Sequence, residues 1–299
     1  MGNPLDEVRV IRFESVERVV DLIKEKYSRT DLRIGFRGHR ESTWELAPSF
    51  SRYIESISDD IHNEHKKGPN YREEIANRLY EQFKENLIVY GDIDETSINS
   101  IDLWQLGQHF GLASPYLDWT YSPYIALFFA LEEQGVSGED GAPDRCLWML
   151  DTDLLSVLND FVREQVWPRN KEKLLPNSLL VQQFPIMEIA REINGSNRRL
   201  VFQKGFFTKH VFYRSFEVWV NRIVDEFPQK ISAYPLLTKL EFPCEGAARV
   251  RALDMLDSMN INHRSLFPDI QGSVKGALET VRRSFRQSPR KSFSFSSPD

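Results

Sequence analysis

Segments in which apolar residues have strand-like spacing alternate with segments of helical spacing along this chain of 299 residues. Residues 32–38 and 237–243 alternate apolar with polar side chains, as half-buried strands do, and 146–150 form a short apolar run typical of a buried strand. In 71–90 and 245–259 the apolar residues recur every three or four positions, which is helical spacing. Because strands and helices are intermixed and the second quarter is mainly helical, the sequence predicts an α+β fold.

Composition and length favour one folded unit. Hydrophobic residues make up 41% of the chain and aromatic residues 12%, which supplies a packed core and excludes general disorder. A single core rarely grows beyond roughly 250 to 300 residues, and no repeat or long linker divides this chain. The sequence therefore predicts one elaborated domain over residues 1–278. Residues 279–299 are rich in Arg and Ser, so we expect a basic, disordered tail there.

The sequence also argues against a membrane protein and a metalloprotein. No apolar run approaches the ~20 residues that cross a bilayer, and the first residues lack the charged and apolar regions of a signal peptide. We therefore expect a cytoplasmic protein with no membrane partner. Cys146 and Cys244 are the only cysteines, and the six histidines show no metal-binding spacing, so no metal is expected.

The most informative local patterns are a strand end and a helix start. Residues 32–38 predict a strand that runs into a tight turn, which puts Arg37 near its end. Residues 117–120 predict a second strand, and 123–133 a helix with Ser122 before it as N-cap and proline in its first turn. Two further candidate strands follow at 199–203 and 206–211.

Three blocks of this sequence resemble the FRG-domain family, which is named for the tripeptide at 36–38. The resemblance is carried by Phe36-Arg37-Gly38 with Trp44 and Arg52, by Gln105 to Gly111 with Leu117 to Ala130, and by Arg199 with residues 203–207. Together the blocks cover roughly residues 33 to 210. Where the family commonly has a threonine-arginine pair, this chain has Ser114-Pro115, so a basic contact is missing there.

A more distant resemblance is to ADP-ribosyltransferases of the arginine-serine-glutamate type. It implies a split central β-sheet with an inserted helical region, and NAD as the substrate. Arg37-Gly38 matches the first position of that pattern, and Thr120 with Ser122 matches the second. At the third position Gln203 stands where the glutamate would be.

This second resemblance implies roles for individual residues. The expected catalytic residues are Arg37, Thr120, Ser122 and Gln203, and the expected NAD-binding residues are Phe36, Arg37, Gly38, His39, His109, Asp118, Tyr121 and Tyr124. An arginine fork can hold a pyrophosphate, a glycine lets a ligand approach the backbone, and a tyrosine can stack on nicotinamide. Because an amide cannot accept the proton of a nucleophile, either the substrate is an amine that needs little deprotonation or another carboxylate enters the site, with Asp118, Glu217 and Glu241 as candidates and Glu241 favoured least.

Simpler structural roles compete with these assignments. Arg37 and Asp118 can pair with each other and lock two strands, and Asp118, Thr120 and Ser122 can serve as helix caps or turn residues. His109 can interact with the last carbonyls of a helix, and Gln203 can satisfy backbone groups in a bulged strand.

The sequence leaves several functions open. The first is an NAD-dependent ADP-ribosyltransferase acting on nucleic acid such as RNA or on protein, as a bacterial toxin or phage-defence effector with a neutralising antitoxin-like partner. The alternative is a non-catalytic module that binds a nucleotide without turnover. A phosphate-handling enzyme that uses Arg37, His39, His109 and Asp118 is a third. The acidic main body argues against a broad nucleic-acid surface, and the alternative left open is a local basic groove formed by Arg163, Arg169, Lys171 and Lys173.

Overall fold

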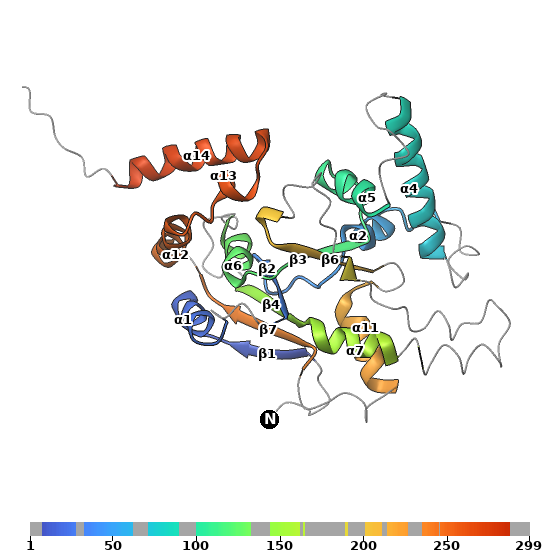
Figure 1. Ribbon diagram of the computed structural model, residues 1–299, viewed down its shortest axis with the longest axis horizontal. Coiled ribbons are helices and arrows are strands. Elements are labelled where there is room, and N and C mark those ends of the chain that lie inside the picture. The colour runs from blue at the N-terminus through green and yellow to red at the C-terminus, as the bar shows by residue number, and fades with distance from the viewer. Residues whose placement is uncertain are drawn as a thin grey trace, which may run out of the picture.

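A seven-stranded sheet runs through the centre of the molecule (Figure 1). In spatial order its strands are β1 (Val8–Arg12), β7 (Leu237–Phe242), β4 (Arg145–Asp151), β2 (Ile34–His39), β3 (Tyr116–Thr120), β6 (Gly205–Lys209) and β5 (Ile189–Ala190). Neighbouring strands are antiparallel except β1 and β7, which are parallel. The computed structural model describes residues 8–27, 33–61, 71–89, 100–132, 144–161, 164, 189–190, 201–210, 214–226, 235–244 and 246–287.

The pairing between β2 and β3, in the middle of the sheet, is very short. β2 pairs with β4 along its whole length, and β3 pairs with β6 in the same way. Between β2 and β3 the register contains a single residue pair, Phe36 with Thr120. Beyond this pair the two strands separate, and the space between their ends becomes available to side chains and ligands.

Helices cover both faces of the sheet. On one face α1 (Val16–Lys26), α6 (Pro123–Leu131) and α12 (Gly246–Ser258) pack over an apolar core. On the other face α7 (Thr152–Phe161) and α11 (Phe216–Glu226) enclose a second core that contains several tryptophans. The chain is therefore an α+β protein, as its apolar spacing predicts.

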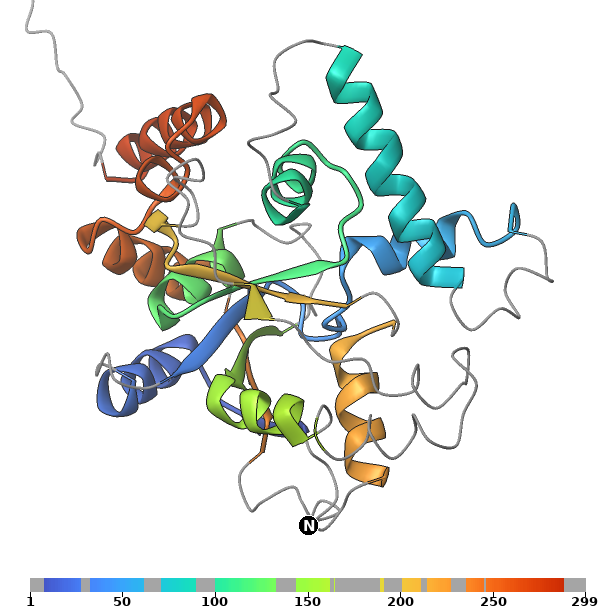
Figure 2. The same cartoon turned by 45° about the vertical axis from the view of Figure 1, so that its right-hand side comes forward.

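The remaining helices form two groups. α2 (Ser49–Ser56), α4 (Tyr71–Val89) and α5 (Ser100–His109) gather at one end of β3 and β6, away from α1 and α12 (Figure 2). The short helix α13 (His263–Leu266) and the long helix α14 (Ile270–Gln287) follow α12. Within the described residues, no helix is long and apolar enough to cross a membrane.

Two segments differ from their predicted conformations. The candidate strand 199–203 was a wrong prediction over its described part, because residues 201–202 are helical and 203–204 form a turn. Lys204 has φ of +48°, a left-handed conformation that no continuing strand contains. Helix α14 runs to Gln287, so the first nine residues of the predicted disordered tail are helical. Residues 288–299 and the candidate basic groove lie outside the described part of the chain.

Candidate functional site

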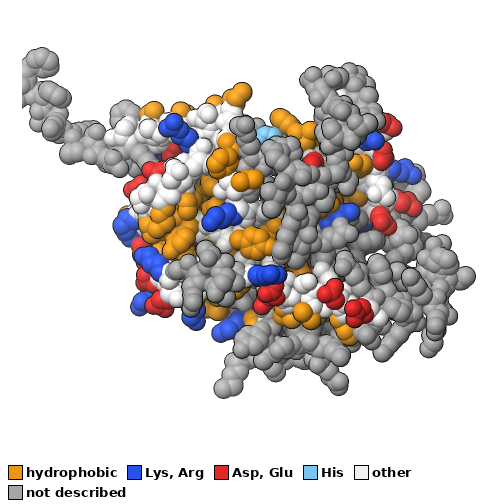
Figure 3. All heavy atoms as spheres, in the orientation of Figure 1, with side chains coloured by type: hydrophobic (Ala, Val, Ile, Leu, Met, Phe, Trp, Pro, Cys, Tyr) orange, Lys and Arg blue, Asp and Glu red, His pale blue; other side chains and the backbone are white. Residues whose placement is uncertain are grey.

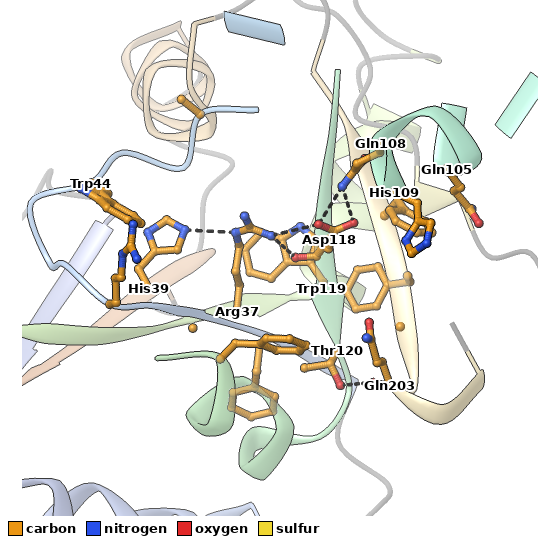
Figure 4. Close-up of a pocket in the computed structure, with 18 of the residues that line it drawn as sticks. Arg37, His39, Trp44, Gln105, Gln108, His109, Asp118, Trp119, Thr120 and Gln203 are labelled. Atoms are coloured by element: carbon orange, nitrogen blue, oxygen red, sulfur yellow. Dashed lines mark hydrogen bonds and ion pairs between the residues drawn. The ribbon is translucent and has the colours of Figure 1, made fainter. Parts of the chain in front are cut away.

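A cleft of about 1760 Å³ opens where β2, β3 and β6 diverge. Its floor is formed by the ends of these strands, and α2, α5 and the connection between α13 and α14 contribute its walls. Figure 4 shows Arg37 near the centre, between His39 on one side and Asp118 on the other. The narrow contact between β2 and β3 therefore places the tripeptide arginine in a cavity.

Arg37 is held by two fixed hydrogen bonds. Its Nε donates to Nε2 of His39 at 3.0 Å, and its Nη1 donates to the backbone carbonyl of Asp118 at 2.7 Å. The same Nη1 lies 3.6 Å from Oδ2 of Asp118, and a quarter of the Arg37 side chain is exposed. Burial lowers the pKa of Arg37, although the charge of Asp118 opposes that effect. The predicted lock between two strands is present, and neither bond uses the second terminal nitrogen, Nη2.

His39 is a neutral acceptor for Arg37. Burial and the neighbouring Arg37 charge lower the pKa of His39 to about 3. Because Nε2 accepts the hydrogen bond from Arg37, the proton of the neutral ring is on Nδ1. His39 therefore acts as a positioning residue that orients the guanidinium.

Asp118 presents a carboxylate to the cleft. Nε2 of Gln108 donates to both of its oxygens, at 2.8 Å each. About half of the Asp118 side chain is exposed. Gln108 itself was not among the predicted site residues, although Gln105 and Gln108 lie three positions apart and hence on one face of a helix.

The structure gives Thr120 and Ser122 structural contacts. The Thr120 hydroxyl donates to the backbone carbonyl of Gln203 at 2.6 Å and accepts from the backbone N–H of Ser122. Ser122 is the N-cap of α6, and its hydroxyl accepts from the backbone N–H of Ile125. Thr120 borders the cleft, whereas Ser122 does not line it. The structure therefore favours the cap and turn roles for this pair.

The two predicted stacking tyrosines do not line the cleft. Tyr121 stacks on Phe206 with ring centroids 4.6 Å apart, and Tyr124 packs against the core beneath α6. Both rings are therefore used in packing.

Phe36 and Gly38 connect β2 to the helix behind it. Side chains alternate along a strand, so these two residues lie on the face opposite Arg37. Phe36 is buried in the core. A Cβ on Gly38 would collide with the carbonyl of Ala126 and lie 2.6 Å from the backbone nitrogen of Ala130. The glycine is therefore required for close packing of α6 on β2, and because Phe36 and Gly38 also border the cleft, the ligand approach at Gly38 stays a prediction.

Gln203 and His109 both contact the C-terminal wall of the cleft. The amide nitrogen of Gln203 donates to the carbonyl of Leu266 at 3.2 Å. Nε2 of His109 lies 3.9 Å from Oδ2 of Asp269. Gln203, His109 and residues 267–269 all border the cleft. The last of these segments was not predicted from the sequence as part of the site. Its residues lie far from the tripeptide in sequence, and only the fold brings them to it.

A buried charge cluster anchors that wall. Nδ1 of His263 lies 2.9 Å from a carboxylate oxygen of Glu279, and Nε2 lies 3.7 Å from Glu132. Nζ of Lys275 lies 3.2 Å from the same Glu132 oxygen. Although burial works against it, the two carboxylates raise the pKa of His263 to about 9. The imidazolium therefore links α6, α13 and α14 at neutral pH.

The aromatic and cationic end of the cleft lies beside α2. The guanidinium of Arg40 stands 4.8 Å above the ring of Trp44, which is 40% exposed. Arg52 also lines this end, and its charge acts on both Arg37 and His39. Such a group of arginines beside an exposed ring suits an anionic ligand with an aromatic base.

Of the three carboxylates considered as a base, Asp118 alone lines the cleft. Glu217 accepts a hydrogen bond from the backbone N–H of Leu46, and burial raises its pKa. Glu241 is paired with Arg12 and Lys239. Among the described residues, no group of three or more His, Cys, Asp or Glu side chains is arranged to hold a metal ion.

Comparison with known proteins identifies one domain. Residues 33–138 match the model of the FRG domain. No curated protein and no solved structure matched this chain. The matched segment contains Arg37, His39, Gln108 and Asp118, whereas Gln203 and the C-terminal wall lie outside it. The segment that matches the FRG domain therefore contains the tripeptide arginine, which lies near the centre of the cleft.

Proposed function

We propose that this protein is an NAD-dependent ADP-ribosyltransferase that uses the cleft around Arg37. The observation that carries the proposal is the fixed guanidinium at a strand end, inside a cavity large enough for a dinucleotide. Arginine donors suit the paired oxygens of a pyrophosphate, and Arg40 and Arg52 extend the positive charge along one side. Trp44 offers an exposed ring beside them for the adenine.

The reaction breaks the bond between nicotinamide and C1′ of its ribose. Nicotinamide departs as a neutral molecule with the bonding electron pair, and C1′ acquires oxocarbenium character. The acceptor atom then forms a bond to C1′ and gives up its proton. In this proposal Asp118 stabilises the developing positive charge and accepts that proton, with Gln108 holding the carboxylate in place.

A non-catalytic nucleotide-binding module is the second candidate. It is favoured by Gln203, which has no carboxyl group and donates its amide to the backbone of Leu266. An amide in that position can hold a ribose hydroxyl but cannot accept a proton. The roles as a toxin or phage-defence effector, and the existence of a neutralising protein, stay predictions.

The two candidates differ in whether NAD is consumed. We would measure NAD binding by calorimetry and nicotinamide release by chromatography for the full chain, Arg37→Ala and Asp118→Asn. Arg33→Ala is the control, because that arginine forms an exposed ion pair with Asp153 and does not line the cleft.

We expect wild type and Arg33→Ala to release nicotinamide. Arg37→Ala should bind NAD roughly ten- to a hundredfold more weakly, because charged hydrogen bonds are lost. Asp118→Asn should bind NAD but release nicotinamide at least ~100-fold more slowly. Binding without release in wild type would support the non-catalytic module. If wild type neither binds nor consumes NAD, both candidates are wrong.

A further inference from the structure

Helix α14 carries a continuous apolar stripe on its outer surface. Four of its large apolar side chains are more than half exposed: Ile270 (83%), Val274 (54%), Leu278 (66%) and Val281 (57%). Their spacing of four, four and three residues keeps them on one side of the helix, since each residue turns by about 100°. In Figure 3 hydrophobic side chains lie along the upper edge of the molecule, where α14 is seen in Figure 1.

The opposite side of α14 is attached to the rest of the protein. A Cβ on Gly272 would collide with the backbone of Phe267, and one on Gly276 would lie 3.4 Å from Cβ of Arg264. Glu279, on the same side, contacts His263. Because this side is closely packed, the stripe has a fixed orientation and faces away from α13.

The stripe begins at the mouth of the cleft. Ile270 directly follows Asp269, which lines the cleft near His109. Next to His109 in sequence is Phe110, which is 73% exposed. Next to Gln203, on the wall that contacts Leu266, is Phe202, which is 53% exposed. Three exposed apolar side chains therefore adjoin residues that line the cleft, and the stripe continues outward from one of them.

The side chains on this surface indicate which class of acceptor it would bind. The smaller described side chains beside the stripe are uncharged as well, namely those of Ser273, Ala277, Thr280 and Ser284. Nucleic acids are bound mainly through Lys and Arg contacts to phosphates, whereas the stripe and this flank are uncharged, and on the other flank Lys275 is paired with Glu132. Apolar anchors of this kind are what a protein partner buries. Arg282 is exposed near one edge, where it suits an acidic side chain of that partner.

We propose that the acceptor is a protein, and that it docks on the stripe of α14 and the apolar rim formed by Phe110 and Phe202. The inference rests on the proposed transferase activity and specifies its acceptor class. A protein segment seated on the stripe reaches the cleft at Asp269, so its modified side chain enters beside His109.

The test separates docking from NAD chemistry. Full-length wild type, Val274→Asp and Leu278→Asp are incubated with NAD labelled in its adenylate part and with a cell lysate, divided into protein and nucleic-acid fractions. Nicotinamide release is measured in parallel without lysate, when water is the acceptor. Val218→Asp on α11 is the matched control, since it places the same charge at a helical valine that is 45% exposed.

We expect wild type and Val218→Asp to label protein. Val274→Asp and Leu278→Asp should label it at least ~10-fold less, because burying a carboxylate against an apolar partner cancels the gain from the side chain it replaces. Their rates of nicotinamide release without lysate should stay within about twofold of wild type, which shows that the cleft is intact.

Four results would overturn the inference. Label on nucleic acid would assign the other acceptor class, and unchanged protein labelling in both variants would remove the stripe from docking. Loss of nicotinamide release in the variants without lysate would show that the stripe supports the fold. A wild-type dimer in size-exclusion chromatography that Leu278→Asp separates would assign the stripe to a second copy of the chain. If wild type releases no nicotinamide at all, the proposed function itself fails, and this inference fails with it.

Discussion

The arginine of the FRG tripeptide is positioned by its neighbours on both sides. His39 lies on the same strand two residues on and accepts from Nε, while the backbone carbonyl of Asp118 on β3 accepts from Nη1. A guanidinium fixed in this way loses little entropy when it binds an anion, which is the advantage of arginine over lysine. The two residues around it in the tripeptide border the cleft as well, and they also pack in the core on the side of α6.

Gly38 offers a prediction at this scale. Gly38→Ala should lower the free energy of unfolding by about 2 to 4 kcal/mol, because its Cβ would collide with the backbone of α6 and force the helix away from β2. Urea unfolding monitored by circular dichroism measures the loss.

Gly111→Ala is the matched control for that substitution. Gly111 has φ of +94° and its added Cβ would meet no atom within 4 Å, so only backbone strain is introduced. That strain should cost about 1 kcal/mol. Equal losses in the two variants would contradict the packing explanation for Gly38.

Ser122 provides a second prediction, which separates a cap from a catalytic group. Ser122→Ala should destabilise the protein by roughly 0.5 to 1 kcal/mol, since the hydroxyl accepts from the N–H of Ile125 at the start of α6. NAD binding should remain within about twofold of wild type, because the side chain does not line the cleft. A much larger loss of NAD binding, with stability unchanged, would restore the predicted catalytic role.

At the scale of elements, the C-terminal helices depend on a buried imidazolium. The folded pKa of His263 is about 9 against an ordinary value of 6.5, so the cluster stabilises the fold fully below pH 6.5. That contribution, up to about 3 kcal/mol, should be lost as the pH rises through 9. We expect unfolding stability to fall between pH 7 and about 9.5, measured by urea titration.

The control for this alkaline loss is a neutral replacement of the histidine. His263→Gln should be less stable than wild type at pH 6 and should show a flatter profile between pH 7 and 9.5, because no imidazolium is available to deprotonate. An equally steep decline in His263→Gln would assign the pH dependence to other groups.

The sequence predicts elements well where apolar spacing is regular. The strand at β2, the helix from Pro123 and the strand at β4 are confirmed, because in each case local pattern and burial agree. The segment before β6 was predicted as a strand because it follows a predicted turn and ends close to Gly205, yet a left-handed residue at Lys204 turns the chain there. The first residues of the predicted disordered tail belong to α14 instead. Their composition suits disorder, but the inner side of this helix is packed on α13.

The site was predictable only in part, for a similar reason. Arg37 and Asp118 lie in short sequence motifs, on strands that pair with each other. Their place in one site could therefore be predicted from the sequence. Phe267 to Asp269 form a wall of the cleft, but only the path of α12 and α13 carries them there. Tyr121 was expected to stack on a ligand, but directly after the end of β3 its ring stacks on Phe206.

At the scale of the whole molecule, two buried neutral histidines make the fold sensitive to acid. Burial lowers the pKa of His39 and of His210 to about 3 each. Both bind protons more tightly when unfolded, so the stability that they contribute is complete above pH 6.5 and is lost as the pH falls toward 3.

We expect the free energy of unfolding to decline steadily below pH 6.5, measured by urea titration between pH 4 and 7. A His39→Gln variant should have a shallower decline, since one of the two protonation sites is absent. If stability is flat over this range in wild type, the two histidines are not buried in neutral form.

The single residue pair between β2 and β3 divides the sheet into two panels, one built on β1, β7, β4 and β2 and the other on β3, β6 and β5. Within the panels, the pairings of β1 with β7, β7 with β4, β4 with β2, and β3 with β6 each contain five or six residue pairs, so the panels resist deformation. The single pair between the panels leaves them freer to rotate relative to each other. A change in the opening angle would widen the cleft without breaking any other ladder. The size of ligand that this protein admits thus depends on one joint, and substitutions at Phe36 or Thr120, which form the joint and also border the cleft, would adjust it.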